Sequence, residues 1–325
     1  MSERDLGEQL VKYLTDVHSI EEQALTQMRR APGIAGDPDI AEAFEQHLRE
    51  TERQEQLIRE RLEAAGGKPS MVKDVAGRAG GVGMVLFAKF QPDTPGKLVV
   101  HAYSYEHLEV AAYELLTRVA ERAGSADTAG VAREIAAEER RMAARLEGVY
   151  DRAVAASFRD LEPDDLTDQI RKYLADAHAI EMQAIQLLER ASTIAEPEAL
   201  ARLYEEHLIE THDHERRINE RLEAIGGSTS NLKDAALRLG ALNWGMFFQA
   251  QPDTPAKLAG FAYAFEHLEA AAYELLKRVA TRAGDAETAA VADSILGEER
   301  AAAAKIAERW DEILDASLAG LAVSR

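Results

Sequence analysis

Apolar residues recur at intervals of three and four positions along almost the whole chain, and the alternation that marks a β-strand is missing. This period places apolar side chains on one face of a helix, so the pattern predicts an all-α protein. Gly66 and Gly67 are expected to cap the second helix in a left-handed conformation. The long helices predicted in the first half cover residues 5–30, 37–66, 94–123 and 127–156, and a crossover with one or two short helices covers 71–90.

The second half of the chain repeats the first. KYLTDVHSIEEQA from Lys12 returns as KYLADAHAIEMQA from Lys172, a displacement of 160 residues that holds for the other repeated segments as well. A constant displacement of this size indicates duplication of a whole domain rather than a short solenoid repeat. Four long helices with one long connection between the second and the third are typical of ferritin-like bundles. We therefore predict two tandem ferritin-like four-helix bundles, with domains at 1–158 and 159–325.

The chain is strongly acidic. Its 325 residues include 58 Asp or Glu against 38 Lys or Arg, a formal net charge of −20. Hydrophobic residues at 46% and charged residues at 30% are typical of a folded globular protein and argue against a disordered one. A surface of this charge repels phosphate backbones and no basic cluster offsets it, so we expect no nucleic-acid partner and favour divalent cations.

Cysteine is absent from the sequence. This excludes disulfides, thiolate catalysis, iron–sulfur clusters and thiolate zinc sites, and leaves His, Asp and Glu as the strong metal ligands. The polar, acid-rich start of the chain lacks the basic and apolar regions of a signal peptide, so we expect a cytoplasmic protein. The most apolar stretch, Gly80 to Phe90, is too short to span a bilayer, and neither a membrane partner nor an organic cofactor is expected.

Each long helix carries glutamate on the stripe of positions that should face a bundle core. In the first helix Leu14, Val17, Glu21 and Ala24 follow one another at helical steps, which puts Glu21 at a core position. The same pattern in the other helices and in the repeat predicts two matched sets of inward carboxylates: Glu21, Glu50, Glu106, Glu109, Glu138 and Glu139, and then Glu181, Glu210, Glu266, Glu269, Glu298 and Glu299.

Ionised carboxylates in a dry bundle centre cost several kcal/mol each unless their charge is neutralised. A pair of divalent cations bridged by carboxylates neutralises it, and an oxygen-rich ligand set suits iron or manganese better than zinc. His47 lies one turn before Glu50, and His207 and His214 flank Glu210, so these imidazoles are the predicted nitrogen ligands. Any one glutamate taken alone is more often a boundary residue whose carboxylate reaches water.

Other polar residues near these stripes have less specific interpretations. Tyr113 and Tyr273 are expected to be core residues that hydrogen-bond a carboxylate. The run from Arg49 to Glu63 is expected to be a solvated face apart from Glu50. His18 and His178 are either ligands or packing residues, and the histidines expected to lie behind the ligands are His107 and His267.

The chain also resembles a known family. The segments Val17-His-Ser-Ile-Glu-Glu-Gln, Phe44-Glu-Gln-His-Leu-Arg-Glu-Thr, Glu106-His-Leu-Glu-Val-Ala-Ala-Tyr and Glu138-Glu139 resemble the helix signatures of the YciE/YciF-type ferritin-like proteins, which are bacterial stress-associated proteins. The resemblance covers most of each repeat. It implies a ferritin-like bundle, members that pair as dimers, and a carboxylate-rich di-iron-type centre whose matching positions here are Glu21, Glu50, Glu106, Glu109 and Glu139.

The fourth helix departs from this pattern. The histidine of the common Glu-x-x-His motif is replaced by Met142 and Ala302, and the acidic residue that the family often carries one position later is Ala143 or Ala303. The Glu-x-x-Glu pair that ends at Glu109 is similar to the rubrerythrin arrangement and compensates for this loss. Without cysteine, the chain has no rubredoxin-like electron carrier.

Two functional hypotheses follow. The first is a pair of dinuclear Fe or Mn centres that react with dioxygen or peroxide in stress protection, as in a ferroxidase- or peroxidase-like oxidoreductase. The second is a metal-free helical scaffold or partner-binding protein whose inward glutamates are protonated or paired with basic residues such as Arg141. In both, the repeats pair within the chain to give a monomer or small oligomer, with Gly80–Phe90 and Gly240–Phe248 covering the interface.

Overall fold

The computed structural model describes residues 2–69, 94–162, 165–195, 198–228 and 254–323. Every regular element within these ranges is a helix, which confirms the predicted all-α class. The chain divides into two compact units, Met1–Arg159 (unit 1) and Asp160–Arg325 (unit 2). None of the helices described combines the length and the apolar character that a membrane crossing requires.

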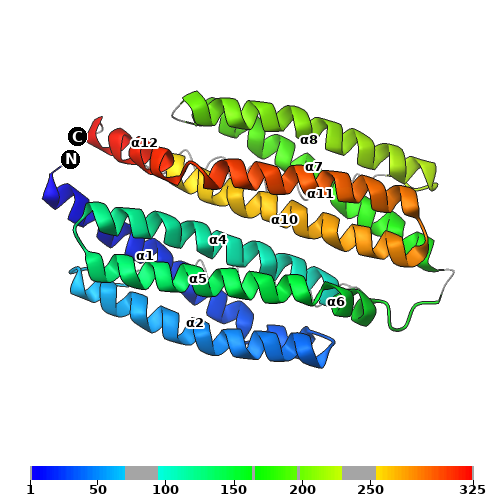
Figure 1. Cartoon of the computed structure of the whole chain (residues 1–325), viewed down its shortest axis with the longest axis horizontal. Coiled ribbons are helices and arrows are strands. Elements are labelled where there is room, and N and C mark those ends of the chain that lie inside the picture. The colour runs from blue at the N-terminus through cyan, green and yellow to red at the C-terminus, as the bar shows by residue number, and fades with distance from the viewer. Residues whose placement is uncertain (1, 70–93, 163–164, 196–197, 229–253, 324–325) are drawn as a thin grey trace. The chain divides into compact units, whose positions relative to one another are not determined.

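Unit 1 is built on long helices that lie alongside one another (Figure 1). In chain order its elements are α1 (Glu3–Met28), the short 3-10 helix η1 (Ala31–Ile34), α2 (Pro38–Ala64), α4 (Thr94–Arg122), α5 (Ala126–Gly148) and α6 (Tyr150–Ser157). Helix α1 packs against α2 and α4, and α5 packs against the same two helices. The long helices therefore surround one core, to which Leu14, Phe44 and Leu116 each contribute a fully buried side chain.

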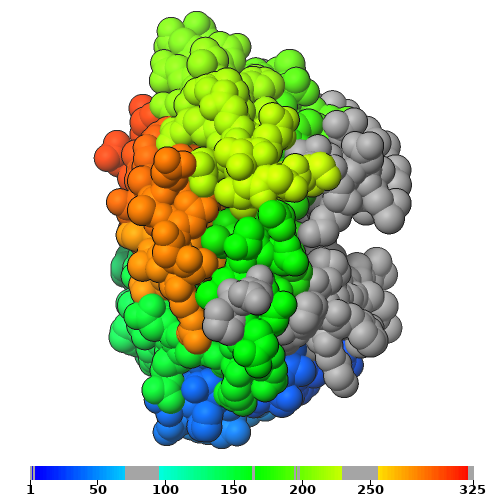
Figure 2. Space-filling view, turned by 90° about the vertical axis from the view of Figure 1, so that its right-hand side faces the viewer, coloured from blue at the N-terminus to red at the C-terminus, as the bar shows by residue number. Residues whose placement is uncertain are grey.

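Unit 2 repeats this arrangement. Its elements are α7 (Leu166–Ile194), α8 (Glu198–Ala224), α10 (Thr254–Ala283), α11 (Ala286–Ala307) and α12 (Trp310–Val323). Helix α7 packs against α8 and α10, and α11 packs against α10 and α8. Figure 2 shows α8 in yellow-green and α11 in orange side by side on the surface of the unit. The predicted inward glutamate Glu299 of α11 is buried, but the expectation that Glu210 and Glu298 also face inward is wrong, because their side chains are 40% and 38% exposed.

Local sequence sets the ends of α2. The Asp37 carboxylate accepts hydrogen bonds from the backbone N–H groups of Asp39 and Ile40 at 3.0 and 3.3 Å, which satisfies two donors that the first helical turn leaves unpaired. At the other end Gly66 has φ = 80°, the left-handed conformation that glycine adopts without steric cost. The predicted left-handed cap is confirmed at Gly66, whereas Gly67 does not have positive φ.

The expectation of one continuous last helix over residues 127–156 is wrong. The chain breaks at Val149 between α5 and α6, and again between α11 and α12 in unit 2. Each short helix begins with a large aromatic residue, Tyr150 or Trp310, that is buried. The Tyr150 ring lies 6.5 Å from that of Tyr103, and the Trp310 ring lies 5.5 Å from that of Tyr263. The break turns a bulky side chain onto α4 or α10, and its burial offsets the lost helical hydrogen bonds.

Several predictions fall on parts of the chain outside the described residues. These are the short helices of the crossover at 71–90 and the apolar interface segments Gly80–Phe90 and Gly240–Phe248. They remain predictions.

Gly36 and Gly66 allow a matched test of backbone strain and packing. Both have positive φ, so alanine at either position costs about 1 kcal/mol of left-handed strain. A Cβ at Gly36 meets Pro95 Cγ at 2.7 Å, whereas one at Gly66 meets nothing within 4 Å. We expect Gly36→Ala to lower the urea midpoint of unfolding more than Gly66→Ala. Equal effects would show that Pro95 moves aside freely.

Candidate metal centre

Unit 1 gathers one histidine and three glutamates at the centre of its helices. His47 comes from α2, Glu106 and Glu109 from α4, and Glu139 from α5, and one ligand atom from each lies within 4.8 Å of the others. All four side chains are buried. His47 Nε2 lies 3.0 Å from Glu106 Oε2 and 3.4 Å from Glu139 Oε2. These four residues form the His47 cluster, which the structure assembles from residues far apart in sequence.

Several oxygen atoms at this centre are buried without a hydrogen-bond partner. They are both carboxylate oxygens of Glu106, Glu139 Oε2 and Glu21 Oε2. An unpaired buried acceptor costs about 1–3 kcal/mol, more when it is charged, so a native protein rarely leaves several together. A divalent cation satisfies such atoms at once, since carboxylate oxygen is a preferred ligand of iron and manganese. The donor set therefore fits the predicted metal.

Glu21 reaches the same centre from α1. Its side chain is fully buried, and the Tyr113 hydroxyl donates a hydrogen bond to its Oε1. Tyr273 donates in the same way to Glu181 in unit 2, so the predicted tyrosine–carboxylate contact is confirmed in both halves. Burial raises the pKa of Glu21 to about 8, against the opposing effect of the tyrosine hydrogen bond. Near neutral pH this carboxyl holds a proton.

Glu50 and Glu138 lie at the edge of the cluster rather than at its centre. The Glu50 side chain is 23% exposed, forms two 3.0 Å hydrogen bonds from Arg145 and contacts His47 Nδ1 at 3.3 Å. The Glu138 carboxylate accepts hydrogen bonds from Gln54 and Arg53. The expectation that Glu50 faces the core is thereby corrected, because Arg145 at the rim provides the more favourable partner, whereas Glu138 is buried.

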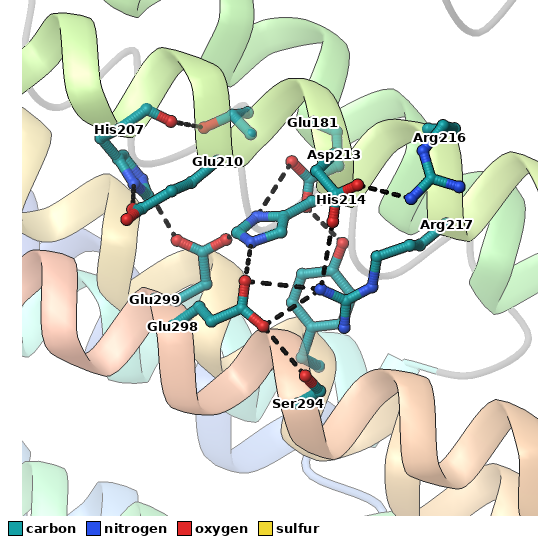
Figure 3. Close-up of polar contacts among 12 residues, drawn as sticks. Glu181, His207, Glu210, Asp213, His214, Arg216, Arg217, Ser294, Glu298 and Glu299 are labelled. Atoms are coloured by element: carbon teal, nitrogen blue, oxygen red, sulfur yellow. Dashed lines mark hydrogen bonds and ion pairs between the residues drawn. The ribbon is translucent and has the colours of Figure 1, made fainter.

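Unit 2 brings together the equivalent residues and one more imidazole. Figure 3 shows two of them, His207 and Glu299, with the additional His214. His207, Glu266, Glu269 and Glu299 form the His207 cluster, in which His207 Nε2 lies 2.7 Å from Glu266 Oε2 and 3.3 Å from Glu299 Oε2. Both oxygens of Glu269 are buried without a hydrogen-bond partner, and those of Glu299 face imidazole nitrogens without hydrogen bonds of acceptable geometry. His207 Nδ1 lies 2.9 Å from Glu210, whose side chain is 40% exposed and so lies further out at the rim than Glu50. A second set, Glu181, His214 and Glu299, shares Glu299 with the first.

Burial and facing charges set the protonation of this second site. Burial raises the pKa of Glu181 to about 8 and that of Glu266 to about 7. Although burial favours a neutral imidazole, the adjacent carboxylates of Glu299 and Glu181 raise the pKa of His214 to about 9. Burial also opposes the charge of Glu299, yet the two facing imidazoles lower its pKa to about 2. Around neutral pH the metal-free site therefore holds exchangeable protons on both its imidazoles and its carboxyls.

The sequence prediction missed a histidine–glutamate pair in each unit, which is buried in unit 1 and partly exposed at Glu215 in unit 2. Glu55 falls within the run expected to be solvated, but its side chain is buried and its Oε1 lies 3.0 Å from His18 Nε2. His178 pairs with Glu215 at 2.9 Å in unit 2. His18 and His178, and likewise Glu55 and Glu215, are related by the repeat displacement of 160 residues. This recurrence is the sequence signal that would have identified the pairs. In unit 1 Glu22 joins His18 and Glu55 as a third group within metal-ligand distance.

The histidines expected behind the ligands are engaged on their own helices. His107 Nδ1 donates to the Tyr103 carbonyl at 2.8 Å, and burial lowers the pKa of His107 to about 4. The His267 ring packs against that of Tyr263, with centroids 4.6 Å apart. These contacts orient both rings along α4 and α10 rather than toward the glutamates.

Comparison with known proteins identifies the same repeat. Residues 5–158 and residues 165–319 each match the model of one family, described as a domain of unknown function (DUF892). The two matches correspond to the two units and support a tandem arrangement. No solved structure matches the chain.

The rim pair of Glu50 gives a pH-dependent contribution to stability. Contacts with His47 and Arg145 lower the pKa of Glu50 to about 2, from about 4.5 when unfolded. A carboxyl group whose pKa is lower in the folded state than in the unfolded state stabilises the protein at pH values above its unfolded pKa. This stabilisation is lost as the pH falls to the folded pKa. We expect Glu50→Gln to lower the urea midpoint at pH 7, and the gap from the parent protein to close between pH 4.5 and 2. The exposed Glu45→Gln is the control, and a gap that persists at low pH would contradict the assignment.

Proposed function

We propose that this chain, which belongs through both of its halves to the DUF892 family of the ferritin-like type, is a di-metal carboxylate protein that binds iron or manganese in each unit. One observation supports this above the others. Each unit buries carboxylate oxygens without hydrogen-bond partners against an imidazole, at distances that suit a shared cation. The ring of contacts among the long helices of each unit supports a ferritin-like bundle as its fold.

The residues of each cluster have distinct roles in this proposal. Glu106, Glu109 and Glu139 in unit 1, and their repeats in unit 2, would hold the metal through oxygen, and His47 or His207 would add nitrogen. Glu50 contacts Nδ1 of His47 and so directs Nε2 at the carboxylates, the outer-shell arrangement that orients many metal-bound histidines. Tyr113 fixes Glu21 through one oxygen and leaves the other available.

A bound iron or manganese pair supplies redox chemistry with dioxygen or peroxide that no side chain provides. The protein's part is to exclude water, since His47 and the three glutamates of its cluster are at most 1% exposed. The resemblance to the YciE/YciF-type proteins suggests oxidative or general stress protection in a bacterial cytoplasm, with ferroxidase- or peroxidase-like activity. The two units would act as an internal pair, in place of the dimer of single-unit relatives.

The metal-free scaffold remains the competing function, and one observation favours it. The imidazoles already lie against the carboxylates, and burial raises the pKa values of Glu109 and Glu139 well above their usual range, which favours the neutral form of both. The expected role of Arg141 is wrong in detail. Arg141 is exposed and lies 3.6 Å from the rim carboxylate Glu138.

Anaerobic loading with Fe(II) tests the proposal directly. We expect each chain to retain iron in both units after desalting, as measured by elemental analysis, and to oxidise it on exposure to air. Glu139→Gln combined with Glu299→Gln removes one buried ligand charge from each cluster and should weaken retention by on the order of tenfold or more. Glu45→Gln with Glu205→Gln is the matched exposed control. A parent protein that retains no iron would establish the scaffold function instead.

Metal binding should also release protons. Glu266, Glu181 and His214 have pKa values of about 7, 8 and 9 without metal, and a ligand must lose its proton to bind. Apparent Mn(II) affinity should therefore rise between pH 6 and pH 9. Calorimetry in two buffers of different ionisation enthalpy measures the released protons. An affinity that is constant over this range would show that these groups are not ligands.

A further inference from the structure

The two units differ at a connected group of positions beside the metal centre. Four residues of α2 and α5 are replaced by chemically different residues at the repeat displacement of 160: Arg53 by Asp213, Gln54 by His214, Leu57 by Arg217 and Glu134 by Ser294. The glutamates that they surround are the same in both units. These four differences therefore lie around a shared carboxylate frame.

In unit 2 the new imidazole points into the centre. His214 is fully buried, and its Nδ1 lies 2.7 Å from Glu299 Oε1 and 3.9 Å from Glu181 Oε2. Neither Nδ1 nor Glu181 Oε2 makes a hydrogen bond of acceptable geometry. Three potential ligand atoms from α7, α8 and α11 thus face one another, and Glu299 links them to the His207 cluster through its other oxygen.

The other side of His214 is held in place. Its Nε2 lies 2.8 Å from Glu298 Oε2, and the Glu298 carboxylate accepts hydrogen bonds from Arg217 at 3.0 Å and from Ser294 at 2.9 Å (Figure 3). A carboxylate on the outer nitrogen fixes the tautomer and orientation of a metal-binding histidine. Two of the replaced residues, Arg217 and Ser294, supply this support. Asp213 Oδ2 in turn lies 3.5 Å from Arg217 Nη1, so all four replacements are connected around the imidazole.

Unit 1 uses the same space for a hydrogen-bond donor. Gln54 Nε2 donates to Glu138 at 3.0 Å and to Glu139 at 2.5 Å, so both amide hydrogens are engaged. An amide nitrogen has no lone pair to offer a metal. Turning the amide would exchange two favourable contacts for a carbonyl oxygen facing two carboxylates. Arg53 adds a further hydrogen bond to Glu138 and strengthens this arrangement.

We infer that unit 2 binds two metal ions bridged by Glu299, whereas unit 1 retains one ion in the His47 cluster, where Gln54 occupies the second position. The inference rests on the proposed function and specifies the number of ions in each unit. The chain then holds about three ions, one pair and one single ion. The matched sequences make this testable by exchanging residue 54 with residue 214.

Mn(II) titration of the full chain under anaerobic conditions is the test. Equilibrium dialysis with elemental analysis counts the ions, and EPR distinguishes an exchange-coupled Mn(II) pair from a single ion. We expect about three ions with a coupled pair. His214→Gln should lower the count to about two and abolish the coupled signal. Gln54→His with Arg53→Asp should raise it to about four and increase that signal about twofold.

The controls separate the inference from the proposed function. The ion that the His207 cluster retains in His214→Gln shows that unit 2 is still folded, and the unit 1 exchange tests for a gain that misfolding cannot produce. The inference would be overturned if the parent chain bound four ions, if it bound two ions without a coupled signal, or if the substitutions at residues 54 and 214 had no effect. Each of these results would leave metal binding itself intact. A parent chain that binds no Mn(II) or Fe(II) would overturn both.

Discussion

The desolvation of carboxylates is the constraint on which the rest of this structure depends. Glu21, Glu106 and Glu139 are completely buried, and a charged oxygen in such a place costs several kcal/mol unless it is paired or protonated. The protein meets this cost with raised carboxyl pKa values and with an imidazole between the glutamates. Protonation and the imidazole together still leave several buried carboxylate oxygens without a hydrogen bond. A cation that binds these oxygens would offset their desolvation.

The long helices hold these groups at the same level within each unit. Carboxylates from α1, α4 and α5 meet because each helix places its glutamate on the inward face at mid-length, and Tyr113 ties α4 to α1 at that level. The last helix bends so that Tyr150 or Trp310 closes the core. Around the rim, Arg145 and Arg53 hold the outer glutamates by charged hydrogen bonds, which keeps positive charge near the site without displacing a ligand.

The two units share one buried group of histidine and glutamate side chains and differ in a second group beside it. The His47 and His207 clusters match residue for residue. Beside them, a glutamine that donates to two carboxylates in one unit is a histidine that faces them in the other. Replacing the hydrogen-bond donor of the Gln54 amide by the lone pair of the His214 imidazole changes the chemistry of the site within the same helical frame. The charge of the neighbouring residue changes with it, from Arg53 in unit 1 to Asp213 in unit 2.

The sequence by itself determined the helical class, the duplication, the C-terminal cap of α2 and the tyrosine–carboxylate contacts, because the helical period and the repeat fix which residues share a face. It also selected glutamates that the structure brings together, such as Glu106 and Glu139. Only the tertiary structure decided that Glu50 lies at the rim with Arg145, that Glu55 is buried against His18 and that the last helix breaks before Tyr150. Each of these depends on which neighbouring helix faces the residue, and the period of a single helix carries no information about its neighbours.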